Sequence, residues 1–383
     1  MIKVEVQEIT NNLDRIRVPL NSMQRAEKET NPIYPYIGAN NIMGYIDEYL
    51  FDEKILCVAE DGGSWGYQQT CANIYNEKVW VNNHAHVLTA KDNLILEYLM
   101  YYLNYADLTL YINGATRGKL TKSSLNGIKI PLPPLDQQKK IAAILDAADA
   151  YRQKTKALIE KYDELTQSLF LDMFGDPITN PKEWEVNFLE QVTTKIGSGA
   201  TPRGGKQAYK KEGISLIRSM NVYDNRFKYK NLAFIDEDQA AKLKNVIVEK
   251  GDVLFNITGA SICRSSVVPN DVLPARVNQH VSILRPIKSI ITSKFLSRFL
   301  ISENVKTKLL GVGSGGGAVM EAITKEQLQS IKVIIPPLEL QNEFSKRVQA
   351  IEAQKSQAQT SLAQAEDLFN SLLQRAFKGE LTS

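Results

Sequence analysis

Apolar and small residues return every three or four positions along two long stretches of the chain. Neither stretch, 136–174 nor 339–378, contains a proline or a glycine, and both consist mainly of good helix formers. A spacing near 3.5 residues is the heptad pattern of helices that pack against each other. We therefore predict two long helices that pair through a shared seam. The residues predicted to form this seam are Ile141, Ile144, Leu158, Leu165 and Leu169 in the first helix and Ile351, Leu362, Phe369 and Leu372 in the second.

The sequence before each long helix is repeated. Pro133-Pro-Leu-Asp-Gln-Gln138 corresponds to Pro336-Pro-Leu-Glu-Leu-Gln341, and the correspondence continues without a gap to Phe174 and Phe377. A repeat unit of this length, which contains a long helix, indicates a duplicated module rather than a solenoid. Two copies of one module can make the same helix contact from both sides only about a pseudo-two-fold axis. We therefore expect the two helices to be antiparallel.

Strand-like segments fill most of the remaining chain. Runs rich in Tyr, Ile and Val are separated by turn signals such as Asp61-Gly-Gly63, and Leu94–Tyr105 has helical spacing. The pattern predicts an α/β protein with a pseudo-two-fold internal repeat: two mixed α/β domains joined by two long antiparallel coiled-coil helices. The expected boundaries are 1–127 for the first domain, 128–175 for the first helical spacer, 176–330 for the second domain and 331–383 for the second spacer.

The duplication extends more faintly into the two α/β domains. Val81-Asn-Asn-His84 corresponds to Val277-Asn-Gln-His280, and Leu120-Thr-Lys122 resembles Ile323-Thr-Lys325. Upstream of these segments the two halves differ almost completely. A shared scaffold with different front portions suggests two related domains that do the same job on different targets.

Composition and charge are those of a soluble globular protein. Hydrophobic residues make up 43% and charged residues 23%, and 383 residues are enough for more than one core. The three cysteines, Cys57, Cys71 and Cys263, form no Cys-x-x-Cys pair, so we expect a reduced, cytoplasmic protein without a disulfide framework. We expect neither a signal peptide nor a membrane span, because no apolar run is long enough. A net charge of +3 gives only weak support for nucleic-acid binding.

No segment carries a convincing cofactor or catalytic motif. Residues 311–316 fit Gly-x-Gly-x-x-Gly but follow no strand, and residues 114–119 resemble a P-loop with the wrong spacing. Asn31-Pro-Ile-Tyr34 is similar to the Asn-Pro-Pro-Tyr loop of amino-methyltransferases but lacks a hydrophobic strand before it. We therefore expect no catalytic residue and no cofactor bound to this chain.

Two histidines suggest a metal site only weakly. His84 and His86 are close in the sequence, but no third ligand cluster is visible. His280 occupies the repeat position of His84, so a hydrogen-bonding role in the scaffold is the better interpretation. We expect no metal.

Basic, amide and aromatic side chains gather in the front part of each domain. For any single residue a solvated loop is the simpler interpretation, but the collective pattern in both domains favours nucleic acid. Arg, Lys, Asn and Gln side chains read base edges, and cationic groups anchor phosphates. We therefore expect contacts with double-stranded DNA. The candidate DNA-contacting residues are Arg15, Arg17, Gln24, Arg25, Tyr36, Asn40, Asn41, Trp65, Gln68, Gln69, Arg117 and Lys119 in the first domain, and Thr201, Arg203, Lys206, Arg218, Asn221, Asn256, Thr258 and Arg264 in the second.

Taken together, the repeated motifs resemble those of the specificity (S) subunit of type I restriction-modification systems, over essentially the whole chain. Each motif is weak alone, but their combination is fairly specific. The motifs are the two Pro-Pro-Leu-x-x-Gln segments, Tyr34-Pro-Tyr-Ile-Gly-Ala39, Gly44-Tyr-Ile46, Gly199-Ala-Thr-Pro202, Gly251-Asp-Val-Leu254 and Val277-Asn-Gln-His280.

The resemblance implies two target recognition domains, each reading one half of a bipartite DNA site and held apart by the helical pair. It also implies two modification (methyltransferase) subunits, which use S-adenosylmethionine to modify adenine, and in some systems restriction subunits. This chain is then a noncatalytic DNA-recognition subunit. The alternatives are a coiled-coil DNA-binding scaffold and a stand-alone DNA methyltransferase. An enzyme that flips a base needs a pocket and a cofactor loop, and the sequence offers neither.

Overall fold

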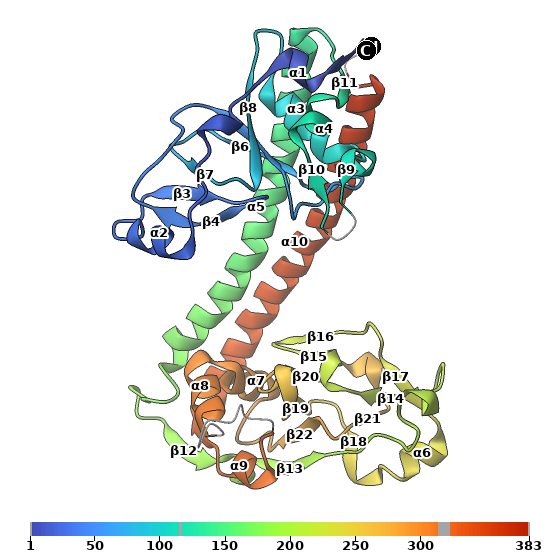
Figure 1. Cartoon of the computed structure of the whole chain (residues 1–383). Helices are drawn as coiled ribbons and strands as arrows, with labels where there is room; N and C mark the ends of the chain where they lie inside the picture. Colours follow the sequence, from blue (N-terminus) through green and yellow to red (C-terminus); the bar gives the residue numbers. More distant parts are fainter. Residues whose placement is uncertain (1, 115–116, 313–321, 382–383) are drawn as a thin grey trace. The chain divides into compact units, whose positions relative to one another are not determined.

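The computed structural model describes residues 2–114, 117–312 and 322–381 (Figure 1). The chain forms two compact units, Met1–Ala157 with Ala358–Ser383, and Leu158–Gln357. Each unit therefore contains one α/β domain and a part of both long helices. Residues 313–316 of the glycine-rich segment and residues 115–116 of the P-loop-like segment lie outside the described residues.

The first unit is built on two small sheets. A four-stranded antiparallel sheet has the order β2-β8-β5-β6, and a three-stranded sheet has the order β4-β3-β7, in which β3 and β7 are parallel. Strand β1 pairs with β11, which joins the beginning of the domain to its end. The strands are β1 (Lys3–Glu5), β2 (Thr10–Asn12), β3 (Tyr34–Ile37), β4 (Ile42–Ile46), β5 (Ile55–Ala59), β6 (Ala72–Tyr75), β7 (Trp80–Val81), β8 (Ala85–Ala90), β9 (Ile112–Asn113), β10 (Lys119–Leu120) and β11 (Lys129–Pro131). The short helices are α1 (Val6–Ile9), α2 (Ser22–Glu27), α3 (Leu96–Tyr105) and α4 (Lys122–Asn126).

The second unit repeats this plan. Its two four-stranded sheets have the orders β13-β22-β19-β20 and β17-β14-β21-β18, in which β14 and β21 are parallel. Strand β12 pairs with β23 as β1 pairs with β11. The strands are β12 (Glu185–Phe188), β13 (Thr193–Ser198), β14 (Ile214–Ile217), β15 (Val222–Tyr223), β16 (Arg226–Phe227), β17 (Ala233–Ile235), β18 (Ile247–Val248), β19 (Val253–Asn256), β20 (Ser265–Val267), β21 (Ala275–Val277), β22 (Val281–Pro286) and β23 (Lys332–Ile335). The short helices are α6 (Glu237–Ala241), α7 (Ser293–Ile301), α8 (Glu303–Val312) and α9 (Lys325–Gln329).

The shared strand order confirms the predicted duplication of the α/β domain. Matching details extend to single side chains, because Thr10 donates its hydroxyl to the carbonyl of Val6 and Thr193 donates its hydroxyl to that of Leu189. The predicted helix near residues 94–105 is α3, and α7 is its counterpart. The expected mixed α/β fold with an internal repeat is therefore correct.

Both predicted long helices are present, as α5 (Leu135–Phe174) and α10 (Leu338–Lys378). In the first unit, Ile141 and Leu145 near the start of α5 share a hydrophobic cluster with Phe369 and Leu373 near the end of α10. In the second unit the pairing is reversed, because Phe170 and Phe174 at the end of α5 cluster with Phe344 at the start of α10. The helices therefore run antiparallel within each unit.

The seam of α5 differs from the predicted one at three of its five positions. Ile144, Leu158 and Leu165 are 37%, 45% and 49% exposed, so their assignment to the seam is wrong. The buried or half-buried positions one residue further on are Leu145, Ile159 and Thr166. Of the other predicted seam residues, Ile141 and Phe369 are buried, and Leu169, Ile351, Leu362 and Leu372 are half-buried. Leu145 and Ile159 are as apolar as their neighbours Ile144 and Leu158, so the heptad pattern alone does not show which of the two faces α10.

The repeated glutamines of the Pro-Pro-Leu-x-x-Gln motif lock each long helix to its α/β domain. Gln138 and Gln341 are both fully buried. The side-chain oxygen of Gln138 accepts the backbone N–H of Ile95 at 3.0 Å, and that of Gln341 accepts the N–H of Thr292 at 2.8 Å. Each amide nitrogen donates to two backbone carbonyls, one of them Pro133 or Pro336 in the motif itself. Because buried polar groups need partners, these bonds make each motif a stable joint between its long helix and its α/β domain.

In the described part of the chain, no helix is long and apolar enough to cross a membrane.

Candidate nucleic-acid interface

One surface turn occupies the same place in both units. It joins β7 to β8 as Asn82-Asn-His84 and β21 to β22 as Asn278-Gln-His280. Asn82 accepts the N–H of His84 on its side-chain oxygen at 2.8 Å, and Asn278 accepts that of His280 at 3.1 Å. An asparagine that bonds to the backbone two residues on closes a turn locally. The side chain of the first asparagine therefore closes each turn, and both histidines also make side-chain hydrogen bonds within the fold.

The histidine of the first turn faces an acidic side chain. His84 Nδ1 lies 2.9 Å from a carboxylate oxygen of Asp61, and Arg117 donates to the same oxygen at 2.8 Å. A carboxylate accepts, so Nδ1 carries the proton. Arg117 remains 67% exposed and His84 40% exposed, so both side chains keep a solvent-facing part.

The histidine of the second turn belongs to a chain of hydrogen bonds that includes neither a carboxylate nor a guanidinium group. Thr201 donates its hydroxyl to the side-chain oxygen of Gln279 at 2.5 Å, and the amide nitrogen of Gln279 lies 3.1 Å from His280 Nε2. His280 Nδ1 lies 2.6 Å from the hydroxyl of Thr258. Asp61 and Thr258 occupy equivalent places, because the residues before them, Glu60 and Ile257, each donate their N–H to the carbonyl of the corresponding histidine. The two turns therefore share a frame but differ in charge.

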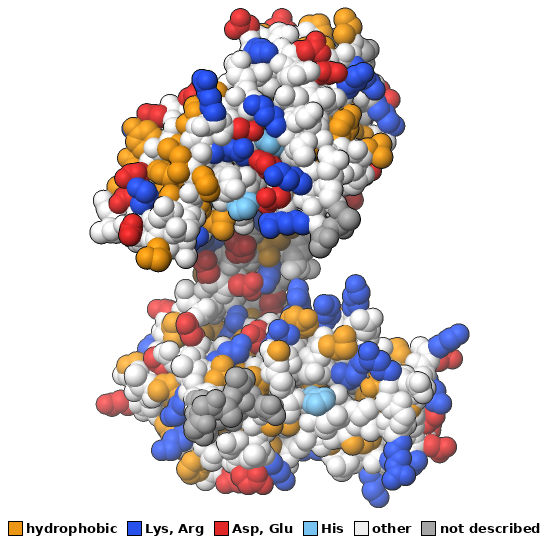
Figure 2. Space-filling model, viewed as in Figure 1, with side chains coloured by type: hydrophobic (Ala, Val, Ile, Leu, Met, Phe, Trp, Pro, Cys, Tyr) orange, Lys and Arg blue, Asp and Glu red, His pale blue; other side chains and the backbone are white. Residues whose placement is uncertain are grey.

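Beside the second turn lies a shallow, open depression of about 360 Å³. It is lined by Ser219, Met220, Tyr223, Thr258, Gly259, Ala260, Ser261, Arg264 and His280. Three cations surround the ring of Tyr223: Arg264 at 4.4 Å and Arg226 and Lys228 at 5.2 Å each from the ring centroid. Among the described residues, none of the three cations has a carboxylate within ion-pair distance. Figure 2 shows Lys and Arg side chains gathered over the region of β15 and β16.

The charge of this cluster acts on the tyrosine hydroxyl. A hydrogen bond from Lys228 and its positive charge, together with Arg264, lower the pKa of Tyr223 below its ordinary value. Unpaired cations next to an exposed hydroxyl form a surface that attracts phosphate oxygens. The depression therefore has the chemistry of a site for a nucleic-acid backbone.

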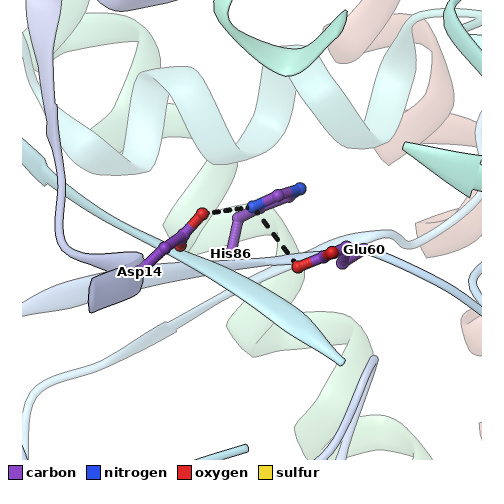
Figure 3. A group of neighbouring side chains, drawn as sticks. All are labelled: Asp14, Glu60 and His86. Carbon is purple, nitrogen blue, oxygen red and sulfur yellow. Dashed lines mark hydrogen bonds and ion pairs between the residues drawn. The ribbon is translucent and has the colours of Figure 1, made fainter. Parts of the chain in front are cut away.

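Asp14, Glu60 and His86 form an ion network in the first domain (Figure 3). His86, only 1% exposed, has Nδ1 at 2.6 Å from Asp14 and 3.7 Å from Glu60, and its Nε2 lies 2.8 Å from the carbonyl oxygen of Leu120. Arg17 and Lys119 also pair with Glu60. Burial alone would raise the pKa of Asp14, but the hydrogen bond and charge of His86 outweigh it and lower that pKa to about 2.

The same three side chains could be read as a metal site, because their ligand atoms lie within 4.8 Å of one another. Sequence reasoning missed Asp14 and Glu60 as neighbours of His86, since they come from distant segments. In the structure, cations and backbone groups already occupy these atoms: Arg17, Lys119 and the N–H of Val87 bind the carboxylates. The arrangement is that of a satisfied ion network.

Four predicted DNA contacts are buried in the fold and are corrected here. Tyr36, Trp65, Asn221 and Asn256 are at most 8% exposed. Trp65 donates to the carbonyl of Ala59, and the amides of Asn221 and Asn256 donate to backbone carbonyls of Lys228 and Ser219. The polar groups of Trp65, Asn221 and Asn256 therefore bond within the scaffold, and Tyr36 is buried at 3% exposure, so none of the four faces a ligand.

The other predicted DNA contacts lie closer to the surface and stay predictions. Several of them are engaged within the protein: Arg17 is half-buried against Glu60, and Arg218 stacks over Tyr209 at 5.1 Å. Arg25 pairs with Glu29, and Gln24 caps its own short helix. The remaining candidates are half-buried or exposed: Arg15, Asn40, Asn41, Gln68, Gln69, Arg117, Lys119, Thr201, Arg203, Lys206, Thr258 and Arg264. Gln279 and Tyr223 are not among the predicted contacts. Gln279 lies in the repeated Asn-x-His turn, and Tyr223 lies in the lysine- and arginine-rich residues 203–230, so the sequence held a signal for each.

The cysteines carry no sign of reactivity. Burial raises the pKa of Cys71 to about 12 and that of Cys263 to about 11, and it also raises the pKa of Cys57. Reactive thiols need the opposite shift, because the thiolate is the nucleophile.

A duplicated α/β domain, with a long helix after each copy, defines an internally repeated protein of two α/β units. Residues 5–162 and 181–366 match the family model described as type I restriction modification DNA specificity domain, and the chain belongs to this family.

Relatives and solved structures agree with this assignment. A putative type I restriction enzyme specificity subunit from Haemophilus influenzae is 28% identical, covering 88% of this chain and 84% of its own length. The EcoBI specificity subunit from Escherichia coli is 28% identical over 69% of this chain and 60% of its own length. The S subunit of the type I restriction-modification system from M. genitalium has the same fold, with a TM-score of 0.61 at 15% identity over 98% of this chain and 96% of that one. The expected resemblance to specificity subunits is therefore correct.

Proposed function

We propose that this chain is the noncatalytic subunit that reads DNA for a type I restriction-modification complex, with each unit contacting one half of a bipartite double-stranded site. The observation that carries the proposal is the pair of equivalent surface turns. Both turns have equivalent backbone hydrogen bonds at their first asparagine and at their histidine. In the first unit Asn83 lies beside the bonded group Asp61, His84 and Arg117. In the second unit Gln279 bonds to Thr201, and Thr258 bonds to the neighbouring His280. A common frame with different reading groups is what two half-sites of different sequence require.

The depression around Tyr223 supports a role in DNA binding. Its unpaired cations would contact backbone phosphates, which position a protein on the duplex without reading sequence. Binding through such contacts weakens as salt rises, because counterions are released from the DNA.

Docking of two modification subunits is the second part of the proposal. Each unit has two exposed apolar residues one heptad apart on its part of α5. They are Ile144 (37% exposed) and Tyr151 (55%) in the first unit, and Leu158 (45%) and Leu165 (49%) in the second. Positions one heptad apart share a face of a helix, and an exposed apolar stripe favours a protein partner. The modification subunits would bring S-adenosylmethionine and the methyl-transfer chemistry, and restriction subunits would join the same assembly where they are present.

Methylation mapping by sequencing, in cells that make the modification subunits, tests this function. We expect a bipartite methylated motif when this chain is present and no such motif without it. Turnover of labelled S-adenosylmethionine by the purified chain alone would instead support a stand-alone methyltransferase. DNA binding that depends on neither sequence nor this chain's modification partners would support a coiled-coil scaffold.

A further inference from the structure

We propose that Gln279 and Asn83 are equivalent base-reading side chains, each selecting an adenine in the major groove of its own half-site. This inference rests on the proposed function and names the groups that would carry it out. Neither residue is among the DNA contacts predicted from the sequence.

The two side chains occupy one position in a duplicated frame. The N–H of Asn82 donates to the carbonyl of Ile37 at 3.1 Å, and the N–H of Asn278 donates to that of Ile217 at 3.0 Å. With the side-chain bonds that close each turn, these contacts fix both ends of the turn. The side chain of the middle residue takes no part in closing the turn. Both middle residues, Asn83 and Gln279, are exposed to solvent.

The amide of Gln279 is held in place before any ligand arrives. Thr201 binds its oxygen at 2.5 Å and His280 binds its nitrogen at 3.1 Å. An amide offers two lone pairs and two N–H groups, so one acceptor and one donor stay available after these bonds. This count is the same if the oxygen and nitrogen are exchanged. His280 is itself held by Thr258, so we infer that Thr201 and His280 are positioning residues.

The free donor and acceptor match one base edge. Adenine presents the N7 acceptor and the N6 donor side by side in the major groove, and asparagine and glutamine pair with them bidentately. A glutamine that is already oriented loses less side-chain entropy on binding. In the described part of the chain Asn83 has no such side-chain bond, so its contact should discriminate less strongly than that of Gln279.

The test uses the complex of this chain with its modification subunits and duplexes that carry the mapped bipartite site. Each base pair of the two half-sites is changed in turn, and binding is measured for the parent and for Gln279→Ala and Asn83→Ala. We expect Gln279→Ala to lose about 5- to 100-fold discrimination at one A·T pair of one half-site, with the other half-site unchanged. Asn83→Ala is the matched control, because it should change only the opposite half-site.

Three further variants separate reading from folding. Gln279→Glu keeps the shape but replaces the donor by an acceptor, so preference at the same position should move from adenine toward cytosine. Thr201→Val and His280→Ala should each reduce discrimination at that same position by less than Gln279→Ala does, with binding to unrelated DNA unchanged.

If Gln279→Ala weakened binding of the complex to all duplexes equally, the inference would be overturned, because this result would indicate a phosphate contact or a structural role. An unchanged specificity profile would also overturn it while leaving the proposed function intact. Failure of the parent complex to prefer a bipartite site would instead overturn the proposed function.

Discussion

The two ring nitrogens of His86 face the carboxylate of Asp14 at 2.6 Å and the carbonyl oxygen of Leu120 at 2.8 Å. A buried polar ring needs partners on both nitrogens, and Glu60 also lies 3.7 Å from Nδ1. Burial would raise the pKa of Glu60, but hydrogen bonds from Arg17 and Lys119 lower it. The network joins strand β8 to segments at both ends of the first domain.

The replacement Asp14→Asn tests this network at the residue scale. The pKa of Asp14 is about 2 in the folded protein, below its ordinary value of 3.8, so the ionised form stabilises the fold. This contribution is complete above about pH 4 and is lost as the pH falls through about 2. We expect Asp14→Asn to lower the free energy of unfolding by about 2 kcal/mol at pH 7, and the difference from the parent to shrink toward pH 2.

Urea unfolding at pH 7, 4 and 3 measures this effect. Asp92→Asn is the control, because Asp92 is exposed, and a surface change of this kind shifts stability by less than about 0.5 kcal/mol. A loss of equal size at pH 7 and pH 3 would show that the carboxylate charge of Asp14 is not what stabilises the network.

At the scale of elements, helix α5 carries two apolar stripes. One stripe contains Ile141 and faces α10, and the other contains Ile144 and Leu158 and is exposed. Both recur at heptad spacing, so periodicity alone does not say which one is internal. The seam also tolerates polar groups, since Thr155 is buried with its hydroxyl bound to the carbonyl of Tyr151, and Arg152 stacks over Phe369 at 4.3 Å.

Neighbouring residues on α5 give a matched test of this seam. Leu145 is fully buried, and Leu145→Ala should lower the free energy of unfolding of the first unit by about 2–5 kcal/mol through the cavity it leaves. Ile144→Ala removes a comparable apolar side chain from an exposed position and should cost less than about 1 kcal/mol. Urea midpoints followed by circular dichroism compare the two. If Ile144→Ala were the more destabilising variant, the seam would have the register that the sequence suggested.

At the scale of the whole molecule, duplication explains why two domains of different surface share one fold. The joints are repeated in detail, as Gln138 and Gln341 show, while the groups around His84 and His280 differ. A scaffold that is fixed at its joints permits independent change at the surfaces that we propose to read DNA.

Exchange of one domain tests this independence. Residues 1–127 are replaced by the matching segment of the Haemophilus influenzae relative, and the methylated motif is mapped as before. We expect one half of the motif to change and the other half to stay, because the strands of each sheet come from a single unit. The reciprocal exchange of residues 176–330 is the control and should change the opposite half. A motif altered in both halves by either exchange would contradict separate reading.

The sequence by itself determined the duplication, the two long helices and the mixed α/β class. These features are periodic or repeated along the chain, so they can be read without knowing which segments meet. The sequence also indicated that basic and aromatic residues gather in the front part of the second domain, which contains Tyr223, Arg226 and Lys228. Composition of that kind marks a segment, but it does not say which of its side chains face solvent.

Only the tertiary structure decided which polar residues reach the surface. Asn256 and Gln279 are both amides in the second domain, yet Asn256 is fully buried and bound to the carbonyl of Ser219, while Gln279 is exposed beside Thr201. Their partners lie far away in the sequence, so burial depends on which strands pair. The same reason applies to His86, whose partners Asp14 and Glu60 come from separate segments that the sheet brings together.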